Sequence, residues 1–214
     1  MIVEFCGIPG GGKSTLARTY AERYPESTLF VGLEMKKRSP EVLYGALFFL
    51  RHPIVSFWLI SFVLRYHMRG LFWYSLHMAI RASAKYQKAR GVRPSMLVFL
   101  DEGLVHILCT ISAYPLSKKD LRKWIERVLL VDVVCVADEG DFHRFHNSHA
   151  SLHPRVRRGD SELKKWELAV SKNTSNVISN LSENGCLMWR IPSKSSLGFE
   201  EKIAMMHMYF KTLT

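Results

Sequence analysis

The stretch Cys6-Gly7-Ile8-Pro9-Gly10-Gly11-Gly12-Lys13-Ser14-Thr15, CGIPGGGKST, holds four glycines, a lysine and two hydroxyl side chains within ten residues. It matches the pattern G-x-x-x-x-G-K-[ST], in which backbone N–H groups converge on phosphate oxygens. A short β-branched and aromatic run at 2–5 precedes it, and a helical pattern at 16–23 follows. The sequence therefore predicts a strand, a phosphate-binding loop and a helix whose positive dipole end attracts the anion.

The residue types of this loop predict ATP and Mg²⁺ as its ligands. Lys13 would reach the β- and γ-phosphates, and the Ser14 hydroxyl would ligate Mg²⁺. We expect Lys13 to be a surface charge that contributes nothing to the core. The other residues expected to contact ATP are Gly7, Pro9, Gly10, Gly11, Gly12 and Thr15.

The composition limits the class of protein. The 214 residues are 48% hydrophobic, which suits one domain, or one domain with an embedded insertion, and excludes a disordered chain. The four cysteines show no C-x-x-C spacing, and at least three lie in apolar runs. Buried thiols in a reducing compartment explain them better than disulfides or zinc. We therefore expect a cytoplasmic protein without a signal peptide.

Apolar runs alternate with helical patterns along the chain, which is typical of a parallel α/β sheet. The fold class predicted is a three-layer α/β fold with a five-stranded parallel sheet and a helical insert. Strands are expected near residues 2–6, 28–32, 96–101, 131–137 and 186–191. Helices are expected near 13–24, 117–130, 161–183 and 198–212, together with an insert at 40–90 that is broken at Pro40, Pro53 and Gly70.

Acidic residues follow two of the predicted strands. Asp101 and Glu102 end the third, and Glu34 follows the second, with Arg38 four residues later. The carboxyl ends of parallel strands share one edge of a sheet, so these groups should lie near the phosphate loop. Asp101 is the candidate Mg²⁺ ligand, and Glu102 and Glu34 are rival candidates for the catalytic base. Arg38 would hold a substrate anion or transition-state charge.

Arginines gather after the fourth predicted strand, in a segment at 142–160 that we interpret as a lid. Clustered arginines on a mobile segment can clamp a triphosphate and neutralise charge as the γ-phosphoryl group moves. A solvated basic loop is the alternative. The lid candidates are Arg144, Arg155, Arg157 and Arg158.

The net charge of +11 is unevenly placed. Between Lys36 and Arg93 the chain has eleven Lys or Arg and one acid, so ten of the eleven net charges lie there, among many aromatic residues. We expect this segment to form the acceptor pocket, with Arg65 and Arg69 contacting the acceptor. Contact with an anionic membrane surface, as a peripheral protein, is left open. Its longest uncharged run after Pro53 is too short to span a bilayer, which takes about 20 residues.

With these parts the chain resembles the P-loop nucleoside and nucleotide kinases, especially the thymidylate-kinase-like members. The resemblance is carried by GIPGGGKST, by Glu34 with Arg38, by LDEG at 100–103, and by a segment from Asp138 that leads into the arginine lid. It implies a P-loop NTPase fold and ATP-dependent phosphoryl transfer to a nucleoside, a nucleotide or another small metabolite. The chain lacks the Asp-Arg pair that thymidylate kinases have after the third strand, and the 40–90 segment matches no known nucleobase pocket. The acceptor is therefore left open.

Two other function classes remain. Asp101 and Glu102 would also serve an ATPase that has no small-molecule acceptor, although no N-K-x-D guanine signature is present. The basic charge would also suit a nucleotide-binding module on RNA or on a membrane, with RNA the weaker alternative. A single domain with an arginine lid favours the kinase. The sequence leaves a homodimer open.

Overall fold

The computed structural model describes residues 1–32, 38–67, 71–112, 114–137, 140, 160–192 and 197–213, with the backbone alone at 38–40 and 160. Five strands form one parallel sheet in the order β2-β3-β1-β4-β5. The strands are β1 (Ile2–Gly7), β2 (Thr28–Val31), β3 (Leu97–Asp101), β4 (Val133–Ala137) and β5 (Met188–Arg190). β1 is central, between β3 and β4, so the loop that follows it opens at the middle of the sheet.

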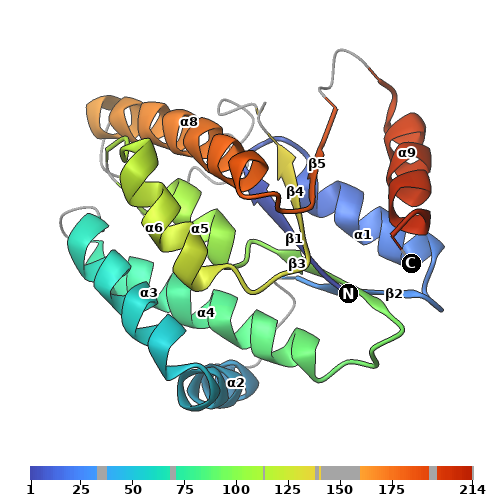
Figure 1. Ribbon diagram of the computed structural model, residues 1–214, viewed down its shortest axis with the longest axis horizontal. Helices are drawn as coiled ribbons and strands as arrows, with labels where there is room; N and C mark the ends of the chain where they lie inside the picture. Colours follow the sequence, from blue (N-terminus) through green and yellow to red (C-terminus); the bar gives the residue numbers. More distant parts are fainter. Residues whose placement is uncertain are drawn as a thin grey trace.

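Helices cover both faces of the sheet, which gives three layers (Figure 1). On one face lie α1 (Lys13–Arg23) and α9 (Phe199–Lys211). The other helices lie on the opposite face: α2 (Arg38–Arg51), α3 (Pro53–Tyr66), α4 (Phe72–Arg90), α5 (Leu104–Thr110), α6 (Lys118–Val128) and α8 (Asp160–Glu183). The α/β class and the five-stranded parallel sheet predicted from the sequence are confirmed.

The protein has one hydrophobic core on each face of the sheet, and alternate side chains of β1 contribute to each. Val3 and Phe5 are fully buried on the face covered by α1 and α9, where the Phe5 ring packs edge-on against Phe99. Cys6 points to the opposite face and joins the larger core under α4, α5 and α6. Because successive strand residues alternate between faces, Glu4 is carried into that second core as well. The expected buried thiols are confirmed for Cys6, Cys109 and Cys135.

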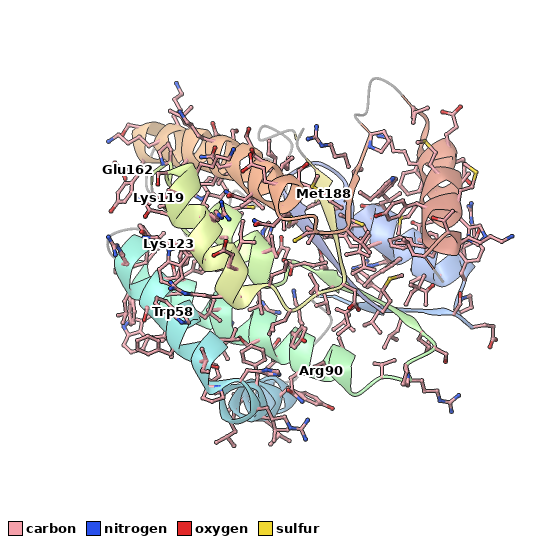
Figure 2. All side chains as sticks on the ribbon, viewed as in Figure 1. Trp58, Arg90, Lys119, Lys123, Glu162 and Met188 are labelled. Carbon is pink, nitrogen blue, oxygen red and sulfur yellow. The ribbon has the colours of Figure 1, made fainter. Side chains whose placement is uncertain are left out.

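The insert between β2 and β3 contains three helices. α2 begins at Arg38 and includes Pro40, so the break predicted at Pro40 is wrong. A proline in the first turn is tolerated because its missing N–H would have no partner within the helix. Pro53 does begin a new helix, α3, as predicted. Gly70 lies outside the described residues. The N-terminal half of α4 extends beyond the carboxyl ends of the strands (Figure 1). Its other end, at Arg90 (Figure 2), leads to the start of β3, and there the ring of His52, between α2 and α3, packs against Tyr86.

The helices α6 and α5 differ in where the residue that caps their N-terminus comes from. The helix predicted from residue 117 is capped by Ser117, whose hydroxyl oxygen accepts a hydrogen bond from the Asp120 N–H at 3.1 Å. The short helix α5, in contrast, was not predicted, and the sequence after Gly103 offers no such cap. The first turn of α5 is capped instead by a residue of strand β1, 102 residues away along the chain.

That distant cap is the buried carboxyl group of Glu4. Its Oε1 accepts a hydrogen bond of 2.7 Å from the His106 N–H, in the first turn of α5. Burial raises the pKa of Glu4 from 4.5 to about 7, although the α5 backbone N–H groups and the charge of Lys85 act in the opposite direction. A Cβ at Gly103 would lie 2.6 Å from the Glu4 Oε2 atom. Only glycine therefore leaves room for this carboxyl group at the start of α5.

The raised pKa of Glu4 predicts a pH-dependent stability. The folded pKa, about 7, exceeds the unfolded value of 4.5, so the folded state binds the extra proton between these pH values. The contribution of Glu4 to folding is therefore complete below pH 4.5 and is lost as the pH rises through about 7. One pKa unit corresponds to 1.36 kcal/mol, so the loss amounts to about 3 kcal/mol.

We expect Glu4→Gln to remove this pH dependence, because the amide keeps the acceptor oxygen and does not ionise. Urea unfolding of both proteins below pH 4.5 and above pH 7 measures the effect. Glu26→Gln, at an exposed glutamate in the α1–β2 loop, is the matched control and should keep the wild-type profile. Equal pH profiles for Glu4→Gln and the wild type would contradict this prediction.

Candidate active site

The glycine-rich loop lies between β1 and α1, as its pattern predicts. Gly7 has φ +107°, and a Cβ there would lie 2.1 Å from the Ala137 carbonyl oxygen of the neighbouring strand β4. Gly12 precedes α1 in a left-handed conformation with φ +78°, which suits glycine. Together they turn the chain from the sheet into the N-terminus of α1, where backbone N–H groups are free to bind an anion.

Lys13 is folded back into its own loop. Its ammonium group donates to the Ile8 carbonyl oxygen at 2.8 Å and to that of Gly7 at 3.4 Å. The side chain is only 5% exposed, so the expectation of a surface charge is wrong, because the loop wraps around the ammonium group. Burial lowers the pKa of Lys13, and the nearby charges of Glu102 and Asp101 oppose that shift.

The structure brings Ser14 and Asp101 together, the two residues predicted to bind Mg²⁺. The Ser14 hydroxyl donates a hydrogen bond of 2.7 Å to Asp101 Oδ1, across 87 residues of sequence. Asp101 is 2% exposed, and its pKa is raised by burial and by the charge of Glu102. A serine hydroxyl and an aspartate carboxylate are hard oxygen donors of the kind Mg²⁺ prefers. No group of three or more His, Cys, Asp or Glu side chains suited to a metal occurs among the described residues.

Donors of this kind fit Mg²⁺ better than zinc. Mg²⁺ usually keeps several waters and is held by one or two carboxylates and by substrate phosphates, so a site with few protein ligands suits it. Ser14 and Asp101 would provide the protein's share of the ligands.

Glu102 has an unusual backbone. Its φ is +58°, the only positive value at a described residue other than glycine. Such a conformation costs about 1–3 kcal/mol and concentrates at functional sites. The side chain is 28% exposed, and its Oε1 lies 3.6 Å from His106 Nε2. The turn therefore places a second carboxylate directly after the one that contacts Ser14.

A residue that the sequence did not single out, Lys85, completes the cluster. It lies on α4 and is 3% exposed, and its ammonium group donates to the backbone carbonyl oxygen of Asp101 and, at 3.4 Å, to that of Glu102. Burial lowers its pKa against the opposing charges of Glu102 and Asp101. Nothing in its local sequence distinguishes it from the other cations of the insert, because its role depends on how α4 packs over β3.

Several predicted site residues fall outside what the structure describes. Arg38 is the first residue of α2, but its side chain is not among those described. Arg65 is exposed near the end of α3, with its guanidinium 5.5 Å from the Tyr66 ring centre. Its role in acceptor binding stays a prediction. The predicted residues that lie outside the described ranges are Glu34, Arg69, Arg144, Arg155, Arg157 and Arg158.

Gly140, a described residue that follows β4, lies against the phosphate loop. A Cβ at Gly140 would lie 2.4 Å from the Pro9 carbonyl oxygen, so the chain at this point packs directly against the phosphate loop. The segment predicted to carry the lid, 142–160, follows two residues later in the sequence, and its arginines lie outside the described residues.

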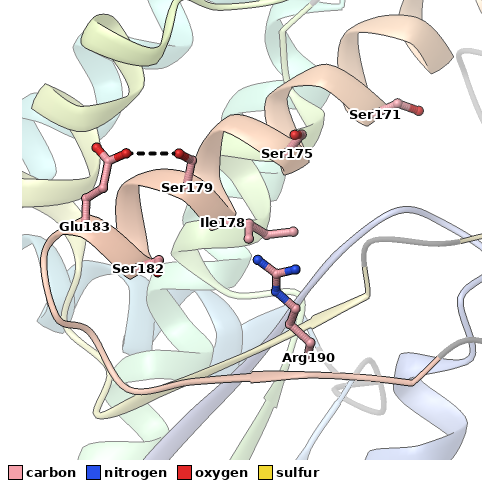
Figure 3. A pocket seen from close by; sticks show the side chains of 7 residues that line it. All are labelled: Ser171, Ser175, Ile178, Ser179, Ser182, Glu183 and Arg190. Atoms are coloured by element: carbon pink, nitrogen blue, oxygen red, sulfur yellow. Dashed lines mark hydrogen bonds between the residues drawn. The ribbon is translucent and has the colours of Figure 1, made fainter.

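A separate cavity of about 520 Å³ lies between α8 and β5 (Figure 3). Arg190 points from β5 toward a row of serines on α8, and the Ser179 hydroxyl donates to Glu183 at 3.2 Å. None of the predicted site residues lines this cavity. The hydrogen-bonded cluster around Asp101, rather than this cavity, is therefore the candidate active site.

The comparisons with known proteins agree with this fold. No protein-family model and no curated protein matches the sequence. Solved structures do match, among them deoxyadenosine kinase from M. mycoides with bound dATP, with a TM-score of 0.53 and 14% identity over 99% of both chains. The same kinase with the products dCMP and a flexible dCDP gives the same TM-score and identity, over 99% of this chain and 100% of that one. This protein has the fold of the P-loop nucleoside kinases.

Proposed function

We propose that this protein is a kinase that transfers the γ-phosphoryl group of ATP to a hydroxyl group of a small molecule, with nucleosides as the leading acceptor class. The observation that carries the proposal is the 2.7 Å hydrogen bond between Ser14 of the phosphate loop and Asp101 at the end of β3. It joins the two oxygen donors that a nucleotide-bound Mg²⁺ requires.

Mg²⁺, when bound, neutralises charge on the phosphates and helps align the transferred group. The chain's own share begins with the loop, whose backbone N–H groups orient the phosphates at the N-terminus of α1. Lys13 already has its ammonium group inside the loop, on the Ile8 and Gly7 carbonyls. Exchanging these carbonyls for phosphate oxygens needs only a movement of the side chain.

In the transfer step the acceptor oxygen bonds to the γ-phosphorus, and the bond from that phosphorus to the ADP oxygen breaks. The acceptor proton passes to a carboxylate, for which Glu102 and Glu34 are the candidates. Glu102 is described and directly follows Asp101, whereas Glu34 lies outside the described residues. We assign Arg38, Arg65 and Arg69 to the acceptor. We assign the lid arginines Arg144, Arg155, Arg157 and Arg158 to the moving charge.

The comparison in fold supports nucleosides as the leading acceptor class. The M. mycoides enzyme is a deoxyadenosine kinase that binds dATP and, as a product, dCMP. At 14% identity the pocket cannot be transferred residue by residue, so the base and the sugar are questions for experiment.

An ATPase without an acceptor is the second candidate. It is favoured by the exposure of Glu102 beside Asp101, since a carboxylate in that position could orient a water molecule as readily as a hydroxyl. Acceptor-dependent turnover separates the two functions.

We expect ATP turnover to depend on an acceptor and on Lys13. Purified protein with ATP and Mg²⁺ is assayed against nucleosides, nucleotides, sugars and lipid-linked alcohols, with phosphorylated product detected by mass spectrometry. Lys13→Ala should lower turnover by about 100-fold or more, the usual cost of losing a positioned charge. Because Lys13 is buried, thermal unfolding of the variant must accompany the assay. ADP release without any phosphorylated acceptor would favour the ATPase.

Asp101→Asn should reduce turnover by about 100-fold and raise the Mg²⁺ concentration needed for half-maximal rate. The amide keeps the size of the side chain and an oxygen for the Ser14 hydroxyl, but it removes the charge. A Mg²⁺ titration of both proteins measures the shift. Asp132→Asn, at an exposed aspartate before β4, is the matched control. An unchanged Mg²⁺ requirement in Asp101→Asn would contradict the assignment.

Glu102→Gln and Glu34→Gln separate the two candidate bases. The variant that lacks the base should lose about 100-fold or more in kcat, with an unchanged Kd for ATP, because general base catalysis acts in the transition state. Stopped-flow turnover and fluorescent-nucleotide titration measure the two constants. If both variants retain wild-type kcat, neither carboxylate is the base.

A further inference from the structure

Exposed apolar side chains are concentrated on the helical insert. Of the thirteen large hydrophobic residues that are exposed in the described structure, seven lie between Val42 and Trp73, on α2, α3 and the start of α4. Single exposed apolar residues are common on soluble proteins, but a contiguous group marks an interaction surface.

Four of these residues lie in the last turn of α2 and along α3, and we name them the elbow stripe. Leu50 is in the last turn of α2 and is 78% exposed, and Ile54, Phe57 and Leu64 follow on α3 with exposures of 72%, 63% and 55%. Spacings of three and seven residues place the three α3 side chains on one face of the helix. The opposite face of α3 is buried in the core through Leu59, Phe62 and Val63. The α3 part of the stripe therefore lies on the face of the helix away from the core.

The charge around the stripe has one sign. Arg51 lies between Leu50 and Ile54, and Arg65 follows Leu64, and both arginines are exposed. The sequence from Val42 to Leu100 contains no Asp or Glu, although it includes eight Lys or Arg. Large apolar side chains flanked by cations are the composition of surfaces that lie in the interface of an anionic bilayer.

We propose that the elbow stripe docks this protein reversibly on an anionic lipid bilayer. Leu50, Ile54 and Phe57 enter the interface between headgroups and acyl chains, and Arg51 pairs with lipid phosphates. This inference does not depend on phosphoryl transfer.

The stripe lies on the bilayer rather than across it. No single helix in the described ranges is long and apolar enough to cross a membrane. The segments Glu41–Arg51 and Pro53–Tyr66 reach that length and hydropathy together, but they are bent by 113°. The buried rings of Phe48 and Phe62 hold both helices in the same core as the sheet, so straightening the pair would remove these rings from it.

A second copy of the chain is the main competing occupant. In a two-fold contact the same patch meets itself, so Arg51 and Arg65 would face their own copies. The stretch from 42 to 100, which contains the stripe, has no acid to face those cations in such a contact. Lipid phosphates supply the missing negative charge.

The test is sedimentation of the full chain with phosphatidylcholine vesicles that contain or lack phosphatidylglycerol, at low and high salt. The wild type should pellet with the anionic vesicles and be released by salt. Arg51→Glu should weaken binding by about tenfold, since each cation near an anionic leaflet contributes on the order of 1 kcal/mol. The combined variant Leu50→Ser, Ile54→Ser, Phe57→Ser should abolish pelleting.

Two matched controls lie on α9, on the other side of the sheet (Figure 1). Met208→Ser removes an apolar side chain that is 61% exposed, and Lys211→Glu reverses an exposed charge. Both should pellet as the wild type does. Circular dichroism and ATP binding check that each elbow variant is folded. Failure of the wild type to pellet with anionic vesicles would contradict the proposal by itself, whatever the variants do.

Three outcomes would overturn the proposal. The wild type could stay in the supernatant with anionic vesicles at low salt. The elbow variants could pellet as well as the wild type. Light scattering without vesicles could show a dimer that the combined elbow variant converts to a monomer, which would identify a second copy as the occupant.

Discussion

The carboxyl end of β3 is fixed by buried charges, and the arrangement of the candidate site depends on them. Asp101 accepts the Ser14 hydroxyl through its side chain and the Lys85 ammonium group through its backbone. Both contacts are largely shielded from water, since Asp101 and Lys85 are 2% and 3% exposed. A buried charge without partners costs several kcal/mol, so each group holds the others in place. The phosphate loop, the end of β3 and helix α4 are thereby fixed relative to one another.

A second buried carboxyl group extends this arrangement to α5. Glu4 occupies the middle of the central strand, where an apolar side chain would be usual, and accepts a hydrogen bond from the first turn of α5. Gly103 leaves the space that the carboxyl group needs. Between the two anchored elements lies Glu102, whose strained backbone is held by the structure on both sides. A carboxylate held in this way is suited to orient a hydroxyl group or a water molecule, which is the chemistry common to both proposed functions.

The insert combines two surfaces on the same three helices. Its inner side supplies Lys85 to the site and Phe48, Leu59 and Phe62 to the core. Its outer side presents the elbow stripe and unpaired positive charge in a sequence without acids from 42 to 100. Aromatic residues in the insert divide accordingly: Trp58 packs against Trp124 and lies under the Arg127 guanidinium, whereas Phe57 is exposed. The Lys85 contact and the elbow stripe therefore lie on different sides of the insert.

By itself the sequence determined the local features: the phosphate loop with its strand and helix, the parallel sheet, the start of α3 at Pro53, and the acids that end β3. These follow from backbone conformation and side-chain periodicity over a few residues, which neighbouring residues dictate. Only the tertiary structure decided which groups meet. Lys85 is one cation among many in its segment, Glu4 is an acid within an apolar strand, and Lys13 was expected at the surface. Their roles come from contacts across 16 and 102 residues and from a loop that closes around its own lysine. Long-range packing and the cost of burying charge set the Lys85 and Glu4 contacts, whose two partners share no short stretch of sequence. The Lys13 contact is local, but its burial depends on how the whole loop folds around the ammonium group.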